Sequence, residues 1–213
     1  TTVTIPNSVT TIGKRVFSFC SGLTTVTIPN SVKIIGERAF FGCSSLISIA
    51  IPNSVISIGD YAFSYCSSLM SITFPESVTY IGKYAFYKCT NLVSVVIPNS
   101  VKFIGPGVFC DCKNLASINI SNRVESIGDY TFSGCTSLKS ITIPDSVIDI
   151  GDEAFYECSN LTSISLGNNV NNIGNLTFGG CASLASITLP ESLKSVGICV
   201  FYGCNNLTSI NVD

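Results

Sequence analysis

The sequence contains no histidine, and charged residues make up only 11% of its 213 residues. Histidine is the commonest base for a serine or cysteine nucleophile and a frequent zinc ligand, so its absence argues against hydrolytic catalysis and against a zinc site. A serine–lysine pair is a chemical alternative, but no residue of either type is placed to suggest one. We therefore expect no enzymatic activity, no cofactor and no metal.

Two further shortages concern partners. The net charge is −2, so the chain lacks the basic surface that nucleic acids or anionic lipids require. No apolar run approaches the roughly 18 residues of a membrane helix, and no signal-peptide pattern opens the chain. The charges are also unevenly divided, because residues 1–106 contain seven Lys or Arg and three Asp or Glu, whereas residues 107–213 contain four and ten. One half is mildly basic and the other acidic.

What the chain does contain is one pattern repeated every 23 residues. Ile143 aligns with Ile120 in one direction and with Leu166 in the other, and no insertion or deletion interrupts the series. Such regular repetition predicts a single stacked solenoid over residues 1–213. Because the first and last residues fall inside repeats, we expect a segment of a longer protein that lacks natural capping repeats.

Each repeat, or rung, predicts the same local structure, and the copy that begins at Leu23 is counted as the second. Val26 and Ile28 alternate with threonines, which is the pattern of a strand buried on one face. Pro29-Asn30-Ser31 predicts a turn. A short extended stretch then ends at Gly36, and the glycine found there in every rung suggests a backbone conformation closed to other residues.

The rest of each rung predicts about two helical turns with an apolar inner face. In the second rung, Ala39, Cys43 and Leu46 stand at positions i, i+4 and i+7. A phenylalanine beside the first of these recurs without a break, so we expect an aromatic column in the core, not a cofactor site. The column comprises Phe17, Phe40, Phe63, Phe86, Phe109, Phe132, Phe155, Phe178 and Phe201.

Eleven cysteines would suggest disulfides, but nine of them occupy one slot of the repeat, three residues before a leucine. We expect buried thiols in this slot, which a small apolar side chain would fill equally well. Cys110 and Cys199 occupy other slots four rungs apart and cannot pair with each other. The column comprises Cys20, Cys43, Cys66, Cys89, Cys112, Cys135, Cys158, Cys181 and Cys204.

The motif Leu23-x-x-Val26-x-Ile28-Pro29-x-x-Val32-x-x-Ile35-Gly36-x-x-Ala39-Phe40-x-x-Cys43-x-x-Leu46 closely resembles the repeat of the BspA-like leucine-rich-repeat surface proteins, and the match extends from Val3 to Val212. The resemblance implies a right-handed α/β leucine-rich-repeat solenoid of about nine rungs, with one parallel β-sheet on the concave face and short helical turns on the convex face. It also implies a cell-surface or secreted protein that adheres to host matrix proteins, host cells or other microbes.

The chain departs from the general leucine-rich pattern after the strand. Ser31 stands where that pattern has Asn or Cys, so Pro-Asn-Ser turns are expected in place of an asparagine ladder. The sixth and eighth rungs depart further, with Ser121-Asn122-Arg123 and Gly167-Asn168-Asn169 at this turn. We expect those two turns to be looser than the others.

The candidate binding site is a group of tyrosines and lysines in rungs three and four. All eight tyrosines lie between the proline turn and the cysteine column, and we expect none on a strand. Grouped aromatics and cations are typical of protein-recognition hot spots, although tyrosine rings that only cover helix edges would give the same pattern. The candidates are Tyr61, Tyr65, Tyr80, Tyr84, Tyr87, Lys83 and Lys88, with Phe41 and Phe103 one rung to either side.

Two other surfaces are weaker candidates. Small uncharged residues such as Ser71 and Thr73 line the strands, either as a hydroxyl ladder that supports strand pairing or as a wall for a glycan or an extended protein. The acidic residues of rung seven form either a solvated edge or a calcium site, and they lack a recognisable calcium-loop spacing. They are Asp145, Asp149, Asp152, Glu153 and Glu157.

The sequence thus favours a binding module at the cell surface or outside the cell. Its expected partners are extracellular or host proteins, with glycans as a second class and no nucleic acid. The alternative is a structural spacer or a self-associating array, in which exposed end strands stack onto neighbouring copies. The two readings differ in whether association needs a specific surface patch.

Overall fold

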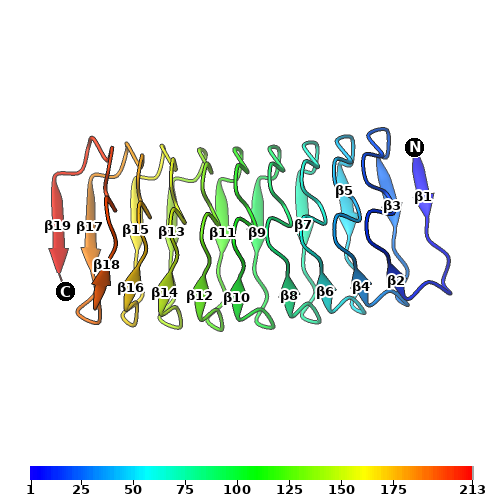
Figure 1. Ribbon diagram of the computed structural model, residues 1–213, viewed down its shortest axis with the longest axis horizontal. Helices are drawn as coiled ribbons and strands as arrows, with labels where there is room; N and C mark the ends of the chain where they lie inside the picture. Colours follow the sequence, from blue (N-terminus) through cyan, green and yellow to red (C-terminus); the bar gives the residue numbers. More distant parts are fainter. Residues whose placement is uncertain (213) are drawn as a thin grey trace.

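The computed structural model describes residues 1–212, which form a row of rungs that each contribute two strands. Figure 1 shows the rungs side by side along the long axis, with the two termini at opposite ends. The strands that open the rungs, called first strands, are β1 (Thr2–Thr4), β3 (Thr25–Thr27), β5 (Ser48–Ala50), β7 (Ser71–Thr73), β9 (Ser94–Val96), β11 (Ser117–Asn119), β13 (Ser140–Thr142), β15 (Ser163–Ser165), β17 (Ser186–Leu189) and β19 (Ser209–Val212). The second strands, which follow the proline turns, are β2 (Thr11–Ile12), β4 (Ile34–Ile35), β6 (Ser57–Ile58), β8 (Tyr80–Ile81), β10 (Phe103–Ile104), β12 (Ser126–Ile127), β14 (Asp149–Ile150), β16 (Asn172–Ile173) and β18 (Ser195–Val196).

All the strand pairs are parallel, and paired residues are 23 positions apart, as in Ser48 with Ser71 and Ile49 with Ile72. First strands pair from β1 to β11, from β13 to β15 and from β17 to β19, whereas second strands pair from β2 to β8 and from β10 to β18. The parallel solenoid expected from the repeat is confirmed. In place of one sheet, however, two ladders enclose the core, and we call their outer sides the first-strand face and the second-strand face.

The core consists of columns of equivalent side chains between the two ladders. Ile35, Phe40, Cys43 and Leu46 are completely buried, and so are their equivalents in the middle rungs. Neighbouring rings of the phenylalanine column are stacked nearly parallel, with centroids 5.2 to 5.9 Å apart from Phe17 to Phe201. The aromatic column is therefore core, as the sequence predicts.

The predicted helical turns are wrong, because residues 1–212 contain no helix, and hence none long and apolar enough to cross a membrane. Two slots of each rung have positive φ, which is incompatible with a right-handed helix, so this stretch is a series of tight turns. The first slot holds Arg15, Arg38, Tyr61, Tyr84, Gly107, Tyr130, Glu153, Leu176 and Cys199. The second holds Phe19, Gly42, Tyr65, Lys88, Asp111, Gly134, Glu157, Gly180 and Gly203.

A glycine follows each second strand, and the structure requires it there for a different reason from the predicted one. Gly59, for example, has no positive φ, but a Cβ atom there would lie 2.6 Å from the backbone nitrogen of Glu37 in the preceding rung. Close approach of adjacent backbones therefore selects glycine at this slot.

The cysteine column is buried from Cys43 to Cys181, as predicted, but the prediction is wrong at its ends, where Cys20 is exposed and Cys204 is half-buried because the end rungs are covered on one side only. The slot is also not merely apolar. Each thiol donates a hydrogen bond to the carbonyl of the phenylalanine 26 residues earlier, as Cys89 does to Phe63 over 3.2 Å. An apolar side chain would leave that buried carbonyl without this donor, so it would not serve equally well. All eleven cysteines are free thiols.

The Pro-Asn-Ser turns are joined by serine hydroxyls. Ser54 Oγ donates to the carbonyl of Val32 over 2.6 Å, and four equivalent serines make the same bond. The first-strand ladder is interrupted twice, between β11 and β13 and between β15 and β17. These interruptions follow the strands of rungs six and eight, whose turns lack the proline and the serine.

We predict that Phe109→Ala lowers the free energy of unfolding by about 3–5 kcal/mol, because it opens a cavity in a fully buried column. Denaturant unfolding followed by circular dichroism measures the change. Phe103→Ala removes a ring that is 49% exposed and should cost only about 0.5 kcal/mol. Equal losses in the two variants would show that the column does not dominate stability.

A second prediction concerns alkaline pH. Burial raises the pKa of Cys43 and Cys158 to about 12 and raises the pKa of Cys89 and Cys135 as well. Thiols of the unfolded chain ionise at about pH 8.5. The stability that the buried neutral thiols contribute is therefore fully present below that pH. Above it, the free energy of unfolding falls by up to about 1.4 kcal/mol per pH unit for each thiol. Under reducing conditions, the denaturant midpoint should fall between about pH 7 and pH 9.5.

The matched control for the pH prediction removes two thiols. The double variant Cys89→Ala and Cys135→Ala should show a shallower fall of the midpoint with pH, although it is less stable at neutral pH. An unchanged slope would contradict the assignment of the pH dependence to the thiol column.

Candidate functional site

Four tyrosines of rungs three and four form one cluster of rings on the second-strand side of the solenoid. The rings of Tyr61 and Tyr84 are stacked with centroids 5.4 Å apart. Tyr87 lies edge-on to both Tyr65 and Tyr84, at 5.3 and 5.7 Å. We call these four residues with Lys88 the aromatic patch. The sequence placed them in one region, and the structure brings them into contact.

The lysine of the patch lies among the rings. Lys88 Nζ is 5.1 Å from the centroid of Tyr87 and 5.4 Å from that of Tyr65, which is within cation–π range. The Lys88 amine is charged at neutral pH, and the Tyr87 side chain raises its pKa further above the ordinary value. Burial raises the pKa of Tyr84, which keeps its phenol neutral there.

Sequence reasoning missed one cation of this surface. The Arg38 guanidinium lies 4.9 Å from the centroid of Tyr61 and 6.0 Å from that of Phe41. Phe41 itself packs against Tyr65 at 5.3 Å, so the cluster continues into rung two. Arg38 and Tyr61 occupy the same slot of neighbouring rungs, and this shared slot was the signal that could have revealed the contact.

The side chains of two further predicted site residues, Tyr80 and Lys83, converge on Asp60, beside the ring cluster. The Lys83 carbonyl accepts a hydrogen bond from the Tyr61 amide over 2.9 Å. The Tyr80 hydroxyl donates to Asp60 Oδ1 over 3.3 Å, and the Lys83 amide donates to the same oxygen over 3.0 Å. Lys83 Nζ also lies 3.9 Å from Asp60 Oδ2. The expectation that no tyrosine lies on a strand is wrong, because Tyr80 belongs to β8.

The acidic residues of rung seven take part in bonds between rungs. Asp152 Oδ1 accepts a hydrogen bond from the Asn175 amide over 2.6 Å, and Asp149 Oδ1 accepts one from the side chain of Asn172. Within residues 1–212, no three histidine, cysteine or acidic side chains are grouped so that they could hold a metal ion. The cluster therefore supports the stack along its edge.

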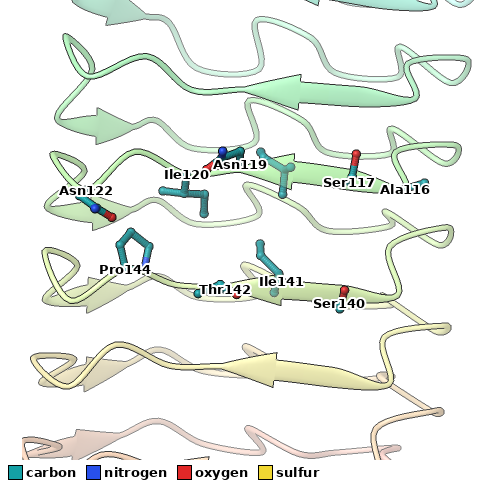
Figure 2. A pocket seen from close by; sticks show the side chains of 10 residues that line it. Ala116, Ser117, Asn119, Ile120, Asn122, Ser140, Ile141, Thr142 and Pro144 are labelled. Carbon is teal, nitrogen blue, oxygen red and sulfur yellow. The ribbon is translucent and has the colours of Figure 1, made fainter.

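The first-strand face carries an open groove of about 420 Å³ between β11 and β13 (Figure 2). Ser117 and Asn119 line it from β11, and Ser140 and Thr142 line it from β13. Asn122 contributes from the turn of rung six. The sequence predicted a hydroxyl wall along this face but gave no sign of the opening within it.

The model of the BspA type leucine rich repeat region, in six copies, matches residues 1–116 and 102–213. The chain belongs to the BspA type leucine-rich repeat family. The comparison with curated proteins gives no match.

Solved structures of other leucine-rich repeat proteins resemble this BspA type chain along nearly its whole length. The protein of T. pallidum is 31% identical over 97% of this chain and 78% of its own, with a TM-score of 0.59. A protein from Bacteroides ovatus is 29% identical over 99% and 78%, with a TM-score of 0.52. A leucine rich cell surface protein from Faecalibacterium prausnitzii, 24% identical over 100% and 87% with a TM-score of 0.58, shows the fold alone.

In this BspA type repeat, the two positive-φ slots display every residue of the aromatic patch except Tyr87. Tyr61 and Tyr84 occupy the first slot, with φ of 55° each, and Tyr65 and Lys88 occupy the second, with φ of 61° and 56°. This conformation costs a residue with a Cβ about 1–2 kcal/mol, and the surrounding ladders maintain it. The slots lie outside the buried columns, so their side chains vary without disturbing the core.

We predict that Asp60→Ala lowers the free energy of unfolding by about 1 kcal/mol, because the Lys83 amide and the Tyr80 hydroxyl lose a shared acceptor. Asp60→Asn keeps an acceptor for the amide and should cost less. Asn175 already plays that part for the Ile198 amide in rung eight. Denaturant unfolding compares the two variants, and the idea fails if the asparagine variant is as unstable as the alanine one.

Proposed function

We propose that this chain is a cell-surface or secreted adhesin-like binding module, and that the aromatic patch is its contact with a protein partner. The single observation that carries the proposal is the cluster of four tyrosine rings with the Lys88 amine and the Arg38 guanidinium over them. Tyrosine and arginine are the residues most enriched at binding hot spots, because they supply large contact areas with polar ends.

Rigidity supports the same proposal. The patch rests on the stacked phenylalanine column and on parallel ladders on both sides of the core. Its side chains are therefore largely ordered before a partner arrives, which reduces the entropy lost on binding. Tyr65 is 40% exposed, and the other three rings are partly exposed, so the patch is accessible.

The location and the partners are inferred from family and surface together. The F. prausnitzii relative is described as a cell surface protein, which supports a surface location for this chain. The partners that we propose are extracellular proteins, including host matrix proteins and proteins of host cells or other microbes. No catalytic role is proposed, because histidine is absent and burial raises the pKa of the Cys110 thiol to about 12.

The test is attachment to immobilised fibronectin, fibrinogen, laminin and collagen and to cultured epithelial cells. The triple variant Tyr61→Ser, Tyr84→Ser and Tyr87→Ser should lose at least about tenfold in affinity for whichever of these probes the wild-type chain binds, since hot-spot residues contribute about 2 kcal/mol or more each.

The matched control carries three tyrosine-to-serine changes in the same slots of other rungs, at Tyr130, Tyr156 and Tyr202. It should bind like the wild type. Equal attachment by all three proteins would contradict the patch and favour the alternative, a spacer or self-associating array. Attachment lost in both variants would point to a general loss of folding, which circular dichroism would show.

A further inference from the structure

The groove between β11 and β13 marks a place where two rungs separate on one face only. On the second-strand face, rungs six and seven remain paired, with Ser126 opposite Asp149 and Ile127 opposite Ile150. On the first-strand face, β11 and β13 belong to different sheets. The two rungs are thus paired on one side and unpaired on the other. The groove on the unpaired side, at about 420 Å³, is larger than the equivalent hollow of about 330 Å³ between the paired strands β5 and β7 (Figure 2).

The buried hydroxyl of Ser146 is independent evidence for the same separation. Serines equivalent to Ser146 donate to a valine carbonyl 22 residues earlier, as Ser31 does to Val9 over 2.7 Å. For Ser146 the equivalent acceptor is the carbonyl of Val124. The Ser146 oxygen is buried and has no hydrogen-bond partner among residues 1–212. The bond between rungs that the other serines make is therefore missing beside this groove.

The turn of rung six explains why the separation occurs here. Ser121 replaces the proline, and its hydroxyl donates to Asn99 Oδ1 of rung five over 2.9 Å while it accepts from the Arg123 amide over 3.0 Å. Arg123 replaces the serine that joins the regular turns. Rung six is therefore held towards rung five at this turn.

The lining defines the chemistry of a ligand. All the lining residues are uncharged, and the polar ones carry hydroxyl or amide groups that both donate and accept hydrogen bonds. The half-buried side chain of Ile118 adds apolar surface, whereas Ile141 and Pro144 are buried beneath it. A charged ligand would lose hydration without gaining a counter-charge, whereas a neutral molecule with many hydroxyl groups and apolar C–H faces matches both components.

An inserted peptide strand does not fit this opening. Cα atoms of β11 and β13 still approach within 8 Å of each other. A third strand between them would need two strand spacings, or roughly 9.5 Å. Groups smaller than a peptide strand, such as sugar hydroxyls, are what the opening admits.

We propose that the groove between rungs six and seven binds a short stretch of a neutral glycan. Side chains of Asn119, Asn122, Ser140 and Thr142 hydrogen-bond the sugar hydroxyls, and the half-buried Ile118 contacts its C–H face. This site lies on the first-strand face and uses no residue of the aromatic patch, so it is a second binding function that is independent of the proposed protein contact.

The test is an NMR titration of the isotope-labelled chain with cellohexaose, maltohexaose and chitohexaose. At least one of these neutral oligosaccharides should produce saturable amide shifts concentrated in residues 116–122 and 140–144. The double variant Asn119→Ala and Asn122→Ala should weaken that binding by about tenfold, which corresponds to the loss of roughly one net hydrogen bond.

The matched control is Asn53→Ala with Thr73→Ala, in the slots equivalent to Asn122 and Asn119, which line the smaller hollow of about 330 Å³ between the paired strands β5 and β7. It should bind within about twofold of the wild type. The triple tyrosine variant should also bind normally, which separates this proposal from the protein contact. The proposed glycan site would be overturned if none of the three sugars gave saturable shifts, or if the shifts appeared at the aromatic patch instead. Equal weakening of binding in the control variant would also overturn it.

Discussion

The hydrogen bond from one rung to the next is the interaction on which this structure depends. Its partners stand at fixed separations. Paired residues of the strand ladders are 23 positions apart, the thiols donate to carbonyls 26 residues earlier, and the turn serines donate to carbonyls 22 residues earlier. A single rung leaves its inward side chains and half of its backbone groups without partners, so stability comes from the interfaces between rungs. The same constancy explains why no insertion interrupts the repeat. One extra residue would displace every bond of a rung at once.

Because of these bonds between rungs, some positions of each rung tolerate many side chains and others tolerate few. Inward slots meet their own equivalents above and below, so they hold nearly the same side chain throughout. The two positive-φ slots project outside the columns, and they hold glycine, arginine, tyrosine, glutamate, lysine and others. A side chain with a Cβ is costly there, and glycine in the same slot shows that the fold does not require one. Tyrosine at Tyr61 and Tyr84 therefore points to a use beyond folding, and the stacked rings of the patch are the structural expression of that use.

The sequence predicted the features that depend on burial and missed those that depend on local backbone geometry. Phe40, Cys43 and Leu46 were assigned to the core because a strict period of apolar residues has no other explanation. The same spacing of i, i+4 and i+7 does not distinguish a helix from a series of tight turns, and the helix prediction failed because φ at Arg38 and its equivalents is positive. The tyrosines of the patch were found from their density in the sequence. Arg38 was missed because its contact with Tyr61 requires knowing that their slot faces outward.

The remaining departures from the regular bonds between rungs lie near Lys83 and Pro106, where the mildly basic half of the chain meets the acidic half. Along one edge, a side-chain oxygen accepts the amide of the next rung, from Asp60 to Lys83 and from Asp129 to Asp152. The Lys83 side chain has no hydrogen-bond acceptor. The residue 23 positions later is Pro106, which has no amide hydrogen to donate. Because the Lys83 side chain lacks the acceptor and Pro106 lacks the donor, no hydrogen-bonding group is left without its partner, and the proline is tolerated there. The second-strand ladder is interrupted between β8 and β10, at the same rungs. The rungs with the aromatic patch thus lie on one side of a break in the ladder, and the acidic rungs lie on the other.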